Sequence, residues 1–390
     1  MTLLYSLDEL QTIRDNFLNE LILAQQDKPT SLAFIKNPLP QQSLVNDKEI
    51  FQTLVVGGTV FKNALVKKTN NQINFIKQKN SPLPIFDTKN DFLAFFVRQI
   101  DPRVKIVGLN FAYHLQPLLR NGLLDGKFIT PTKENRFSGL INKLVGQELE
   151  NYVLEKIKRR VRVAVANDTI CLLLSTPPSL TRCLLAAGVV GAGTNFAFYL
   201  DQKTIVNLES GNFDKFTQTE SGKIIDKNST NPGQQLFEKE VSGAYLYQHY
   251  NFNTDRNQSR HYLISTSELS PLAEKHNLVA QKLLERSASL IACQITGIYL
   301  FKKTRSTKLE ARNKFEFLNF INPKIVSDFD IRNSDFSVVF VMEGSLFWHG
   351  WHYKQMVEKY LKKLGVSEKA IKFIKIENSS LIGASRLVTG

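Results

Sequence analysis

Two apolar periodicities alternate along this 390-residue chain, one of about 3.6 residues and one of every second residue, and they predict its helices and strands. At the amino end, Ser6 and Glu9 have the spacing of a helix capping box, and apolar residues follow at helical intervals as far as Leu21. Further along, short apolar runs bounded by glycine turns predict strands, and longer amphipathic stretches predict helices. The expected strands are 51–56, 60–67, 73–76, 104–113, 161–166, 184–190, 195–200, 204–209, 338–344 and 371–376. The expected helices are 92–97, 141–158 and 272–301, with a short terminal helix after 383 and a polar surface loop over 217–232.

The order of these elements repeats. A strand, a glycine turn, two further strands and a helix occur once around Gly57-Gly58 and again around 191–193. This repetition predicts an α/β protein with two related domains that face each other across a cleft. The length and a hydrophobic content of 43% are enough for two ordinary cores. We therefore expect a helix and arm over 1–48, a small domain over 49–175, and a large domain over 176–390 whose terminal helix is able to return to the small domain.

The net charge of +14 bears on the choice of partner. Basic residues are most concentrated in the segment 156–162, and such a concentration of positive charge attracts nucleic acid or acidic lipid. No recognised nucleic-acid motif accompanies this segment, so we interpret it as a solvated helix end and do not expect nucleic acid as a partner. No apolar run is long enough to span a bilayer, so no membrane span is expected.

The cysteines and histidines suggest no metal chemistry. Cys171, Cys183 and Cys293 lack the spacing of metal ligands, and we interpret all three as small buried hydrophobes. This cysteine usage, together with an amino terminus that has no secretory pattern, favours a reducing cytoplasm. His349 and His352 are three residues apart, but two histidines alone do not make a metal site, and we predict none.

One acidic turn lies between the two glycine hairpins. A strand that includes Val165 runs into Asn167-Asp168-Thr169, a trio that hydrogen-bonds its own backbone and favours turns. Ordinary turn chemistry is the commonest reason for such a trio. A carboxylate at the end of a strand, beside an amide and a hydroxyl, also has the means to take a proton from a bound alcohol. The glycine hairpins on either side suggest a phosphate donor held against a sugar-like acceptor.

Four motifs in one order relate the chain to a known family. The most specific is Asn231-Pro-Gly-Gln-Gln-Leu-Phe-Glu-Lys-Glu-Val-Ser-Gly-Ala-Tyr-Leu246, and the others are 165–169, Gly191-Ala-Gly-Thr-Asn195 and 207–213. From about Ser31 to its carboxyl end, the chain resembles the sugar kinases of the hexokinase type, within the actin-like ATPase fold. The resemblance implies two actin-like (ribonuclease H-like) domains flanking a cleft, and ATP-dependent phosphorylation of a hexose.

The resemblance implies a hexose site built from polar side chains. Hexose hydroxyls both donate and accept hydrogen bonds, so a selective site needs amides and carboxylates around them. Asp168 is expected to act as the general base for the primary hydroxyl, and Lys133 to help keep that carboxylate ionised. The implied substrate-binding residues are Thr132, Lys133, Asn167, Asp168, Asn195, Glu209, Gln235 and Glu238.

The resemblance also implies ATP as the phosphate donor, with Mg²⁺ entering on ATP. The implied ATP-binding residues are Gly57, Gly58, Thr59, Lys62, Gly191, Gly193, Thr194, Gly344, Ser345, Ser380 and Gly383. Several family residues are replaced in this chain. Val55 stands where the family has the aspartate that helps to place magnesium, and Ala192 replaces a phosphate-binding threonine. The adenosine loop reads Ser379-Ser-Leu-Ile-Gly-Ala384, and on the sugar side Ala112 and His114 replace a serine and a proline.

Three functions are compatible with this mixture of kept and replaced residues. The first is an ATP-dependent hexokinase that phosphorylates glucose or a similar hexose at its primary hydroxyl, and it is favoured because Asp168 and its sugar-side neighbours are intact. The second is a hexokinase-like sugar-binding or regulatory protein with weakened catalysis, which Val55 and Ala192 would explain. The third is a basic binding protein that uses the segment 156–162.

Overall fold

The computed structural model describes residues 4–40, 42–58, 60–70, 72–130, 135–254, 262–318 and 336–390, with side chains described for all of these except 307–318. The chain divides into two compact units. Unit 1 contains Met1–Phe34, Val189–Asn195 and Glu209–Ile374, and unit 2 contains Ile35–Gly188, Phe196–Leu208 and Lys375–Gly390. The chain therefore passes from one unit to the other within β9 (Leu185–Val190) and within β10 (Thr194–Tyr199).

Unit 2 is built on a five-stranded sheet with the strand order β4-β3-β2-β5-β8. β2, β5 and β8 are parallel to one another, whereas β3 is antiparallel to both β2 and β4. The predicted hairpin on either side of Gly57-Gly58 is confirmed, with Val55 of β2 opposite Lys62 of β3. The strands are β2 (Ile50–Val56), β3 (Val60–Thr69), β4 (Gln72–Pro82), β5 (Ile106–Phe111) and β8 (Arg162–Ala166).

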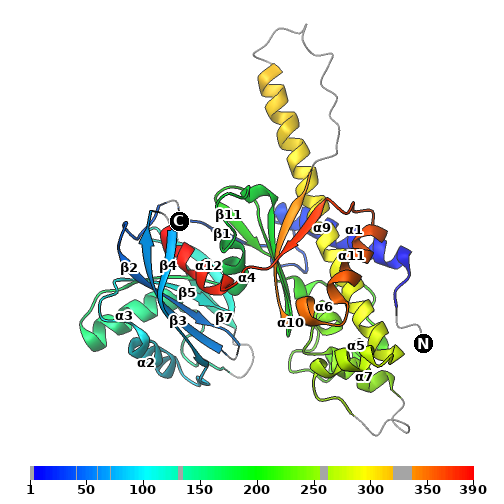
Figure 1. Cartoon of the computed structure of the whole chain (residues 1–390), viewed down its shortest axis with the longest axis horizontal. Helices are drawn as coiled ribbons and strands as arrows, with labels where there is room; N and C mark the ends of the chain where they lie inside the picture. Colours follow the sequence, from blue (N-terminus) through cyan, green and yellow to red (C-terminus); the bar gives the residue numbers. More distant parts are fainter. Residues whose placement is uncertain are drawn as a thin grey trace. The chain divides into compact units, whose positions relative to one another are not determined.

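Helices cover both faces of this sheet. Val107 and Leu109 of β5 belong to a phenylalanine-rich core, to which α2 (Lys89–Gln99) and α3 (Val145–Ile157) contribute. Gly108, between them, points to the other face, because side chains alternate along a strand. There it meets α12 (Ser379–Thr389), which packs against α4 (Asp168–Leu174) and contacts β2 and β5 (Figure 1).

Two glycines allow α12 to lie this close. A Cβ atom on Gly108 would overlap the backbone carbonyl of Ala384 in α12, and a Cβ on Gly383 would overlap the carbonyl of Cys171 in α4. Backbone atoms inside packed helices and strands have little room to move aside. Both positions therefore require glycine for packing.

Unit 2 contains a second group of antiparallel strands. β1 pairs with β11, and β11 pairs with the Ala197–Tyr199 part of β10. A separate hairpin of β6 and β7 was not predicted, because residues 114–130 interrupt their apolar pattern with charged residues and a proline. The bounds are β1 (Ile35–Pro38), β6 (His114–Arg120), β7 (Leu123–Thr130) and β11 (Thr204–Asn207), with a 3₁₀ turn at Arg182–Leu184.

Unit 1 is largely helical and centres on α9 (Leu278–Leu318), which contacts α1 (Leu7–Gln25) and α11. The predicted capping box of Ser6 and Glu9 is confirmed at the start of α1. Figure 1 shows the last part of α9 extending beyond the other helices of the unit, well past the predicted end at 301. The remaining bounds are α5 (Glu220–Lys227), α6 (Leu236–Val241), α7 (Leu246–Asn253), α8 (Leu269–Glu274), α10 (Ser345–His349), α11 (Tyr353–Lys363), β12 (Val338–Glu343), its parallel partner β13 (Ile371–Ile374), and 3₁₀ turns at Ser210–Asn212 and Thr266–Glu268.

Several local expectations are wrong. The expected loop 217–232 contains α5, which begins because the side chain of Thr219 accepts a hydrogen bond from the Gly222 amide. The segment 379–383 does not precede the terminal helix but forms its beginning. Cys183 is exposed, whereas Cys171 and Cys293 are buried as expected. Among the helices described, none is long and apolar enough to cross a membrane.

Candidate active site

Asp168 lies at the junction between β8 and α4 in unit 2. Asn167 is the N-cap of α4, and its side-chain oxygen accepts a hydrogen bond from the Ile170 amide at 3.1 Å. The segment 167–169 is therefore the start of a helix and not the independent turn that its composition suggested. Asp168 is the first residue of that helix, where the helix dipole favours a carboxylate.

The Asp168 carboxylate is held through one of its two oxygens. Oδ1 accepts hydrogen bonds from the Thr169 amide at 2.8 Å, the Asn167 side-chain amide at 3.0 Å and the Thr169 hydroxyl at 3.2 Å. From the part of the chain that the structure describes, Oδ2 accepts no hydrogen bond. Asp168 is half-buried, so this carboxylate is oriented by its neighbours and still accessible.

The first glycine hairpin ends at the same edge of the sheet as Asp168. β2, β5 and β8 are parallel, so Gly57-Gly58 after β2 and Asp168 after β8 both lie at the carboxyl edge, separated by β5 alone. Neighbouring strands are about 4.8 Å apart, which places β2 and β8 about 10 Å from each other. The predicted phosphate hairpin and the predicted base are thus brought to one edge of unit 2.

A row of four residues runs across this edge in register: Lys62, Val55, Asn110 and Ala166. The Lys62 ammonium donates a hydrogen bond to the Ser380 hydroxyl at 3.2 Å, so two of the predicted ATP-binding residues are in contact. Asn110 is only 1% exposed, and its side-chain oxygen has no hydrogen-bond partner among the described residues. Asn110 was not among the predicted site residues, although an amide inside the apolar run 104–113 was a visible signal.

Some predicted residues of unit 2 remain untested or have another explanation. Thr59, Thr132 and Lys133 lie outside the described residues, so the expected contact of Lys133 with Asp168 stays a prediction. Gly383 lies in α12 against the backbone of Cys171. Its glycine identity is explained by helix packing, whether or not a nucleotide binds there.

In unit 1, residues of the motif 231–246 hydrogen-bond to the second glycine hairpin, at 191–193. The Gly191 amide donates to the Gly193 carbonyl at 2.9 Å and closes the turn. The Gly243 amide donates to the Gly191 carbonyl at 2.7 Å, and the Ala244 amide to the Ala192 carbonyl at 3.1 Å. Residues 231–246 therefore support the hairpin in addition to supplying predicted sugar ligands.

Glu238 connects the predicted sugar ligands to this hairpin. Its Oε2 atom accepts a hydrogen bond from the Thr194 amide at 2.8 Å. A Cβ atom on Gly193 would lie 2.8 Å from the same oxygen, and one on Gly211 would lie 3.0 Å from the Glu238 Cβ. Both glycines thus leave room for the Glu238 side chain, and the structure brings Thr194 and Glu238 together.

The other predicted sugar ligands of unit 1 surround this contact. The Asn195 side-chain oxygen accepts a hydrogen bond from the Ser210 amide at 3.2 Å, next to Glu209. Glu209 and Gln235 both have left-handed backbone conformations, with φ of +47° and +52°. Such conformations are unfavourable for residues other than glycine, asparagine and aspartate. Eleven other non-glycine residues of the described chain share this region, so the φ values place Glu209 and Gln235 in tight turns and do not by themselves indicate binding.

Gly344 and Ser345 lie at the base of the second hairpin. Gly344 has φ of +111°, and a Cβ atom there would overlap the Val190 carbonyl. The Gly344 Cα lies 3.2 Å from a Cβ position built on Gly191. Two predicted ATP-binding segments of unit 1 are therefore in contact, and Ser345 begins α10 beside them. In the part of the chain that is described, no three His, Cys, Asp or Glu side chains are arranged to hold a metal ion.

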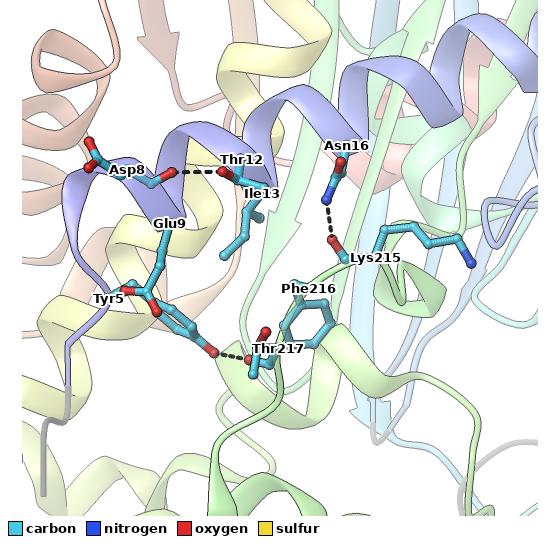
Figure 2. A pocket seen from close by; sticks show the side chains of 9 residues that line it. All are labelled: Tyr5, Asp8, Glu9, Thr12, Ile13, Asn16, Lys215, Phe216 and Thr217. Carbon is cyan, nitrogen blue, oxygen red and sulfur yellow. Dashed lines mark hydrogen bonds between the residues drawn. The ribbon is translucent and has the colours of Figure 1, made fainter.

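A pocket of about 400 Å³ in unit 1 lies away from these residues (Figure 2). It lies between α1 and the segment 215–217, and none of the predicted sugar or ATP ligands lines it. Across it, the Tyr5 hydroxyl donates to the Thr217 carbonyl at 2.6 Å and the Asn16 amide to the Lys215 carbonyl at 3.0 Å. We interpret this pocket as a gap in the packing between α1 and the segment 215–217. Its lining residues are Tyr5, Asp8, Glu9, Thr12, Ile13, Asn16, Lys215, Phe216 and Thr217.

Comparison with known proteins agrees with these observations. The family profile described as Hexokinase matches residues 186–250 and 252–389, which is more than half of the chain. Hexokinase-1 of Arabidopsis thaliana is 25% identical over 408 aligned positions, which cover 88% of this chain and 79% of the plant protein. Hexokinase-3 of Mus musculus is 26% identical over 271 positions, covering 62% of this chain and 29% of the mouse protein. The chain thus spans less than a third of this mammalian relative.

Solved structures show the same fold. A hexokinase crystal structure superposes with a TM-score of 0.74 at 17% identity, covering 99% of this chain and 96% of that chain. The hexokinase from Schistosoma mansoni, complexed with glucose, superposes with a TM-score of 0.72, the same identity and the same coverage of both chains. The predicted α/β class with the actin-like architecture is confirmed. With its family profile, motifs and fold in agreement, this chain belongs to the hexokinase family.

Proposed function

We propose that this protein is an ATP-dependent hexokinase that phosphorylates glucose, or a similar hexose, at its primary hydroxyl. The observation that carries the proposal is the Asp168 carboxylate. It is oriented through Oδ1 by three donors and lies at the same sheet edge as the Gly57-Gly58 hairpin. A general base and a phosphate cradle are the two protein parts that phosphoryl transfer to an alcohol requires.

In this proposal, Asp168 Oδ2 would accept the proton of the sugar's primary hydroxyl while the hydroxyl oxygen bonds to the γ-phosphorus of ATP in line and the bond to the departing ADP breaks. The three hydrogen bonds to Oδ1 hold the carboxylate in one orientation, so the base does not need to reorganise during the reaction. Lys133 would add a positive charge that keeps Asp168 ionised. Asn167 and Thr132 would orient the sugar.

The hexose ligands of unit 1 would be Asn195, Glu209, Gln235 and Glu238. Two of them, Glu209 and Gln235, lie on left-handed turns, and the Glu238 carboxylate accepts a hydrogen bond from the Thr194 amide. A hexose hydroxyl that binds Glu238 would therefore meet a carboxylate already oriented by the phosphate hairpin. This arrangement supports a site in which sugar and phosphate contacts are built on the same loops.

The residues present fit a nucleotide phosphate chain. Lys62 and Ser380 supply an ammonium and a hydroxyl that contact each other. The Gly57, Gly191 and Thr194 amides already donate hydrogen bonds within their own units. When bound, Mg²⁺ would neutralise charge on the phosphates, and ATP would donate the phosphoryl group. The solved ROK family glucokinase from Streptomyces griseus is in complex with glucose and AMPPNP, and it superposes with a TM-score of 0.50 at 14% identity, covering 87% of this chain and 99% of that chain.

A hexokinase-like sugar-binding protein with weakened catalysis is the second candidate. Val55 is 5% exposed and lies in register between Lys62 and Asn110, where the family aspartate would help to place magnesium. Ala192 removes a hydroxyl from the other hairpin. Loss of one preorganised contact to a reacting group typically lowers the rate by roughly 10²–10³-fold. We therefore propose a slow kinase, with turnover below about 10 s⁻¹.

The basic segment 156–162 offers little support for the third candidate, a basic binding protein. Lys156 pairs with Glu155 at 2.8 Å. Arg159 donates to the carbonyls of Asp101 and Val104, and Arg162 to that of Asn121. Three of its basic side chains therefore have partners within the fold, which supports the interpretation of a solvated helix end.

A coupled assay that detects ADP release with glucose and ATP tests the proposal. We expect slow, glucose-dependent turnover, and ³¹P NMR should show the product phosphorylated at the primary hydroxyl. A panel of other hexoses would establish which sugar is preferred. Glucose binding by calorimetry without turnover for any hexose would instead support the second candidate. Absence of both sugar binding and turnover would contradict the proposal.

A further inference from the structure

Helix α6 carries two adjacent charged residues that no step of the proposed reaction uses. Lys239 and Glu240 are both 0% exposed. Lysine and glutamate are almost never fully buried unless they are paired, because removing each charge from water costs several kcal/mol. Replacing such pairs by apolar residues is often neutral or stabilising, so global stability alone is a weak reason for them. Their partners indicate what else they do.

Lys239 ties α6 to the turn that precedes it. Its ammonium lies 2.6 Å from Asp226 Oδ1 and donates to the Asn231 carbonyl at 2.8 Å. The two oxygens of Asp226 also accept hydrogen bonds from the Gly233 amide at 3.0 and 3.1 Å. The turn 231–235 is therefore held at two points, its first carbonyl and its middle amide, by one ion pair whose lysine is fully buried and whose aspartate is half-buried.

Gln235, a predicted sugar ligand, is the last residue of this turn and the N-cap of α6. The Asn231 side-chain amide donates to Gln235 Oε1 at 2.8 Å, and Gln235 itself is in the left-handed region. Gly233 also has a positive φ, of +78°. Within the turn, the Gln234 amide donates to the Asn231 carbonyl at 3.2 Å, the same carbonyl that Lys239 binds. The Asp226–Lys239 pair adds the contacts that connect this turn to α5 and α6.

Glu240 and the main chain of α6 fix the helix to the body of unit 1. Glu240 accepts hydrogen bonds from the Thr219 amide at 2.8 Å and from its hydroxyl at 3.0 Å, and it pairs with buried Arg286 of α9 at 3.3 Å. The Lys239 carbonyl is bonded by His249 at 2.8 Å, and the Val241 carbonyl by Ser287 at 2.6 Å. These contacts hold α6 against the rest of unit 1, and Lys239 hydrogen-bonds the turn 231–235 to α6.

We propose that the ion pair between Asp226 and buried Lys239 positions the hexose ligands, holding Gln235 on its turn in register with Glu238 on α6. This inference rests on the proposed function of Gln235 and Glu238 as sugar ligands. Lys239 touches neither the reacting atoms nor the sugar, so it is a positioning residue. Loss of the pair should therefore weaken hexose binding much more than it slows the chemical step, whose base lies in unit 2.

The test is Lys239→Met, which keeps an unbranched chain of similar length and removes the charge. We expect the Kd for glucose, measured by calorimetry, to rise at least about tenfold, because small displacements of binding groups typically cost up to about 10²-fold. The kcat at saturating glucose should change less than threefold. Hydrogen exchange should quicken in peptides that cover 231–235.

Two further variants complete the test. Asp226→Asn removes the same ion pair with little change of shape, and it carries the test if Lys239→Met does not fold. In the double variant, the two losses of affinity should not add, because both remove one interaction. The matched control is Lys223→Met, which breaks the exposed Lys223–Glu220 pair of α5 and should leave glucose affinity and exchange at 231–235 unchanged.

The outcomes separate the inference from the proposed function. Unchanged glucose affinity in folded Lys239→Met and Asp226→Asn, while the wild-type protein binds glucose, would overturn the inference and leave the proposed function standing. Equal losses of kcat and affinity, or fully additive effects, would show a general structural role and also overturn it. A wild-type protein that binds no hexose would overturn the proposed function, and the inference with it.

Discussion

At the scale of single residues, the candidate site depends on how carboxylates are held. Asp168 is oriented through one oxygen by three donors, and Glu238 is oriented by one backbone amide of the phosphate hairpin. Nearby, burial and the negative charge of Glu238 raise the pKa of Tyr245, so this phenol stays protonated and able to donate. Asp168 and Glu238 could be predicted from the sequence because both belong to motifs with polar residues at fixed spacing. They did not reveal Lys239, because a charged residue in a sequence is normally taken as exposed.

His249 gives a prediction about pH and stability. Burial, together with the positive charge of Arg286, holds the pKa of His249 well below its usual value in the folded state. As the pH falls below about 6.5, the unfolded chain binds a proton that the folded protein does not, so stability decreases by up to about 1.4 kcal/mol per pH unit. His249→Gln removes this effect. Urea unfolding of both proteins between pH 7.5 and 5 should show the stability advantage of the wild type shrinking as the pH falls, and a constant difference would contradict the assignment.

At the scale of elements, most strands were predictable, but β1, the hairpin of β6 and β7, and the short helices were not. The hairpin of β2 and β3 was predicted nearly to its bounds, because apolar runs on both sides of Gly57-Gly58 leave little choice of register. In contrast, α4, α5 and α6 have six to eight residues each, too few to show a helical apolar period. α4 and α5 begin at side-chain caps, whereas α6 has none and is held by its buried polar residues. Helix α6 is the clearest case, since its charged residues Lys239 and Glu240 lie in the core.

The two glycine hairpins, which we propose bind phosphate, give a second prediction. Val55 is buried in register with Lys62, and Ala192 is exposed at the tip of the other hairpin. The double change Val55→Asp with Ala192→Thr would supply a carboxylate beside the Lys62 ammonium and a hydroxyl where there is room for one. We expect turnover to rise at least about tenfold, since each contact of this kind contributes roughly 10²-fold or more, and these effects need not add. Steady-state kinetics at saturating glucose measures it, with Ala192→Ser as a single-site control. Unchanged turnover in a folded double variant would show that these contacts do not limit the rate.

At the scale of the whole molecule, the predicted ligands divide between the two units. Asn167, Asp168, Lys62 and Ser380 belong to unit 2, and Asn195, Glu209, Gln235 and Glu238 belong to unit 1. The repeated order of strands and glycine hairpins predicted the α/β class correctly. It did not predict the length of α9, because the apolar helical pattern ends near 301 while the helix continues to Leu318. In that part the sequence is rich in charged residues and gives no burial signal.

Thermal unfolding measures binding to the whole molecule. A ligand that binds only the folded state stabilises it by about 2.7 kcal/mol at one hundred times its Kd. If the proposed sugar ligands bind glucose and the replacements at Val55 and Ala192 weaken phosphate binding, millimolar glucose should raise the Tm by several degrees, and ATP with magnesium at the same concentration should raise it less. Galactose serves as a control for sugar specificity. A larger shift with ATP than with glucose would contradict the proposed weakening of the phosphate site.

The most direct test of the account is the rate of phosphoryl transfer by Asp168→Asn. The amide keeps the size of the side chain and its place at the start of α4, but it does not accept a proton. We expect kcat to fall by about 10²–10⁴-fold, the usual contribution of a general base, while calorimetry shows glucose affinity within a few-fold of the wild type. Retention of wild-type kcat by a folded Asp168→Asn protein would contradict the account, because the proton of the primary hydroxyl would then be taken by another group.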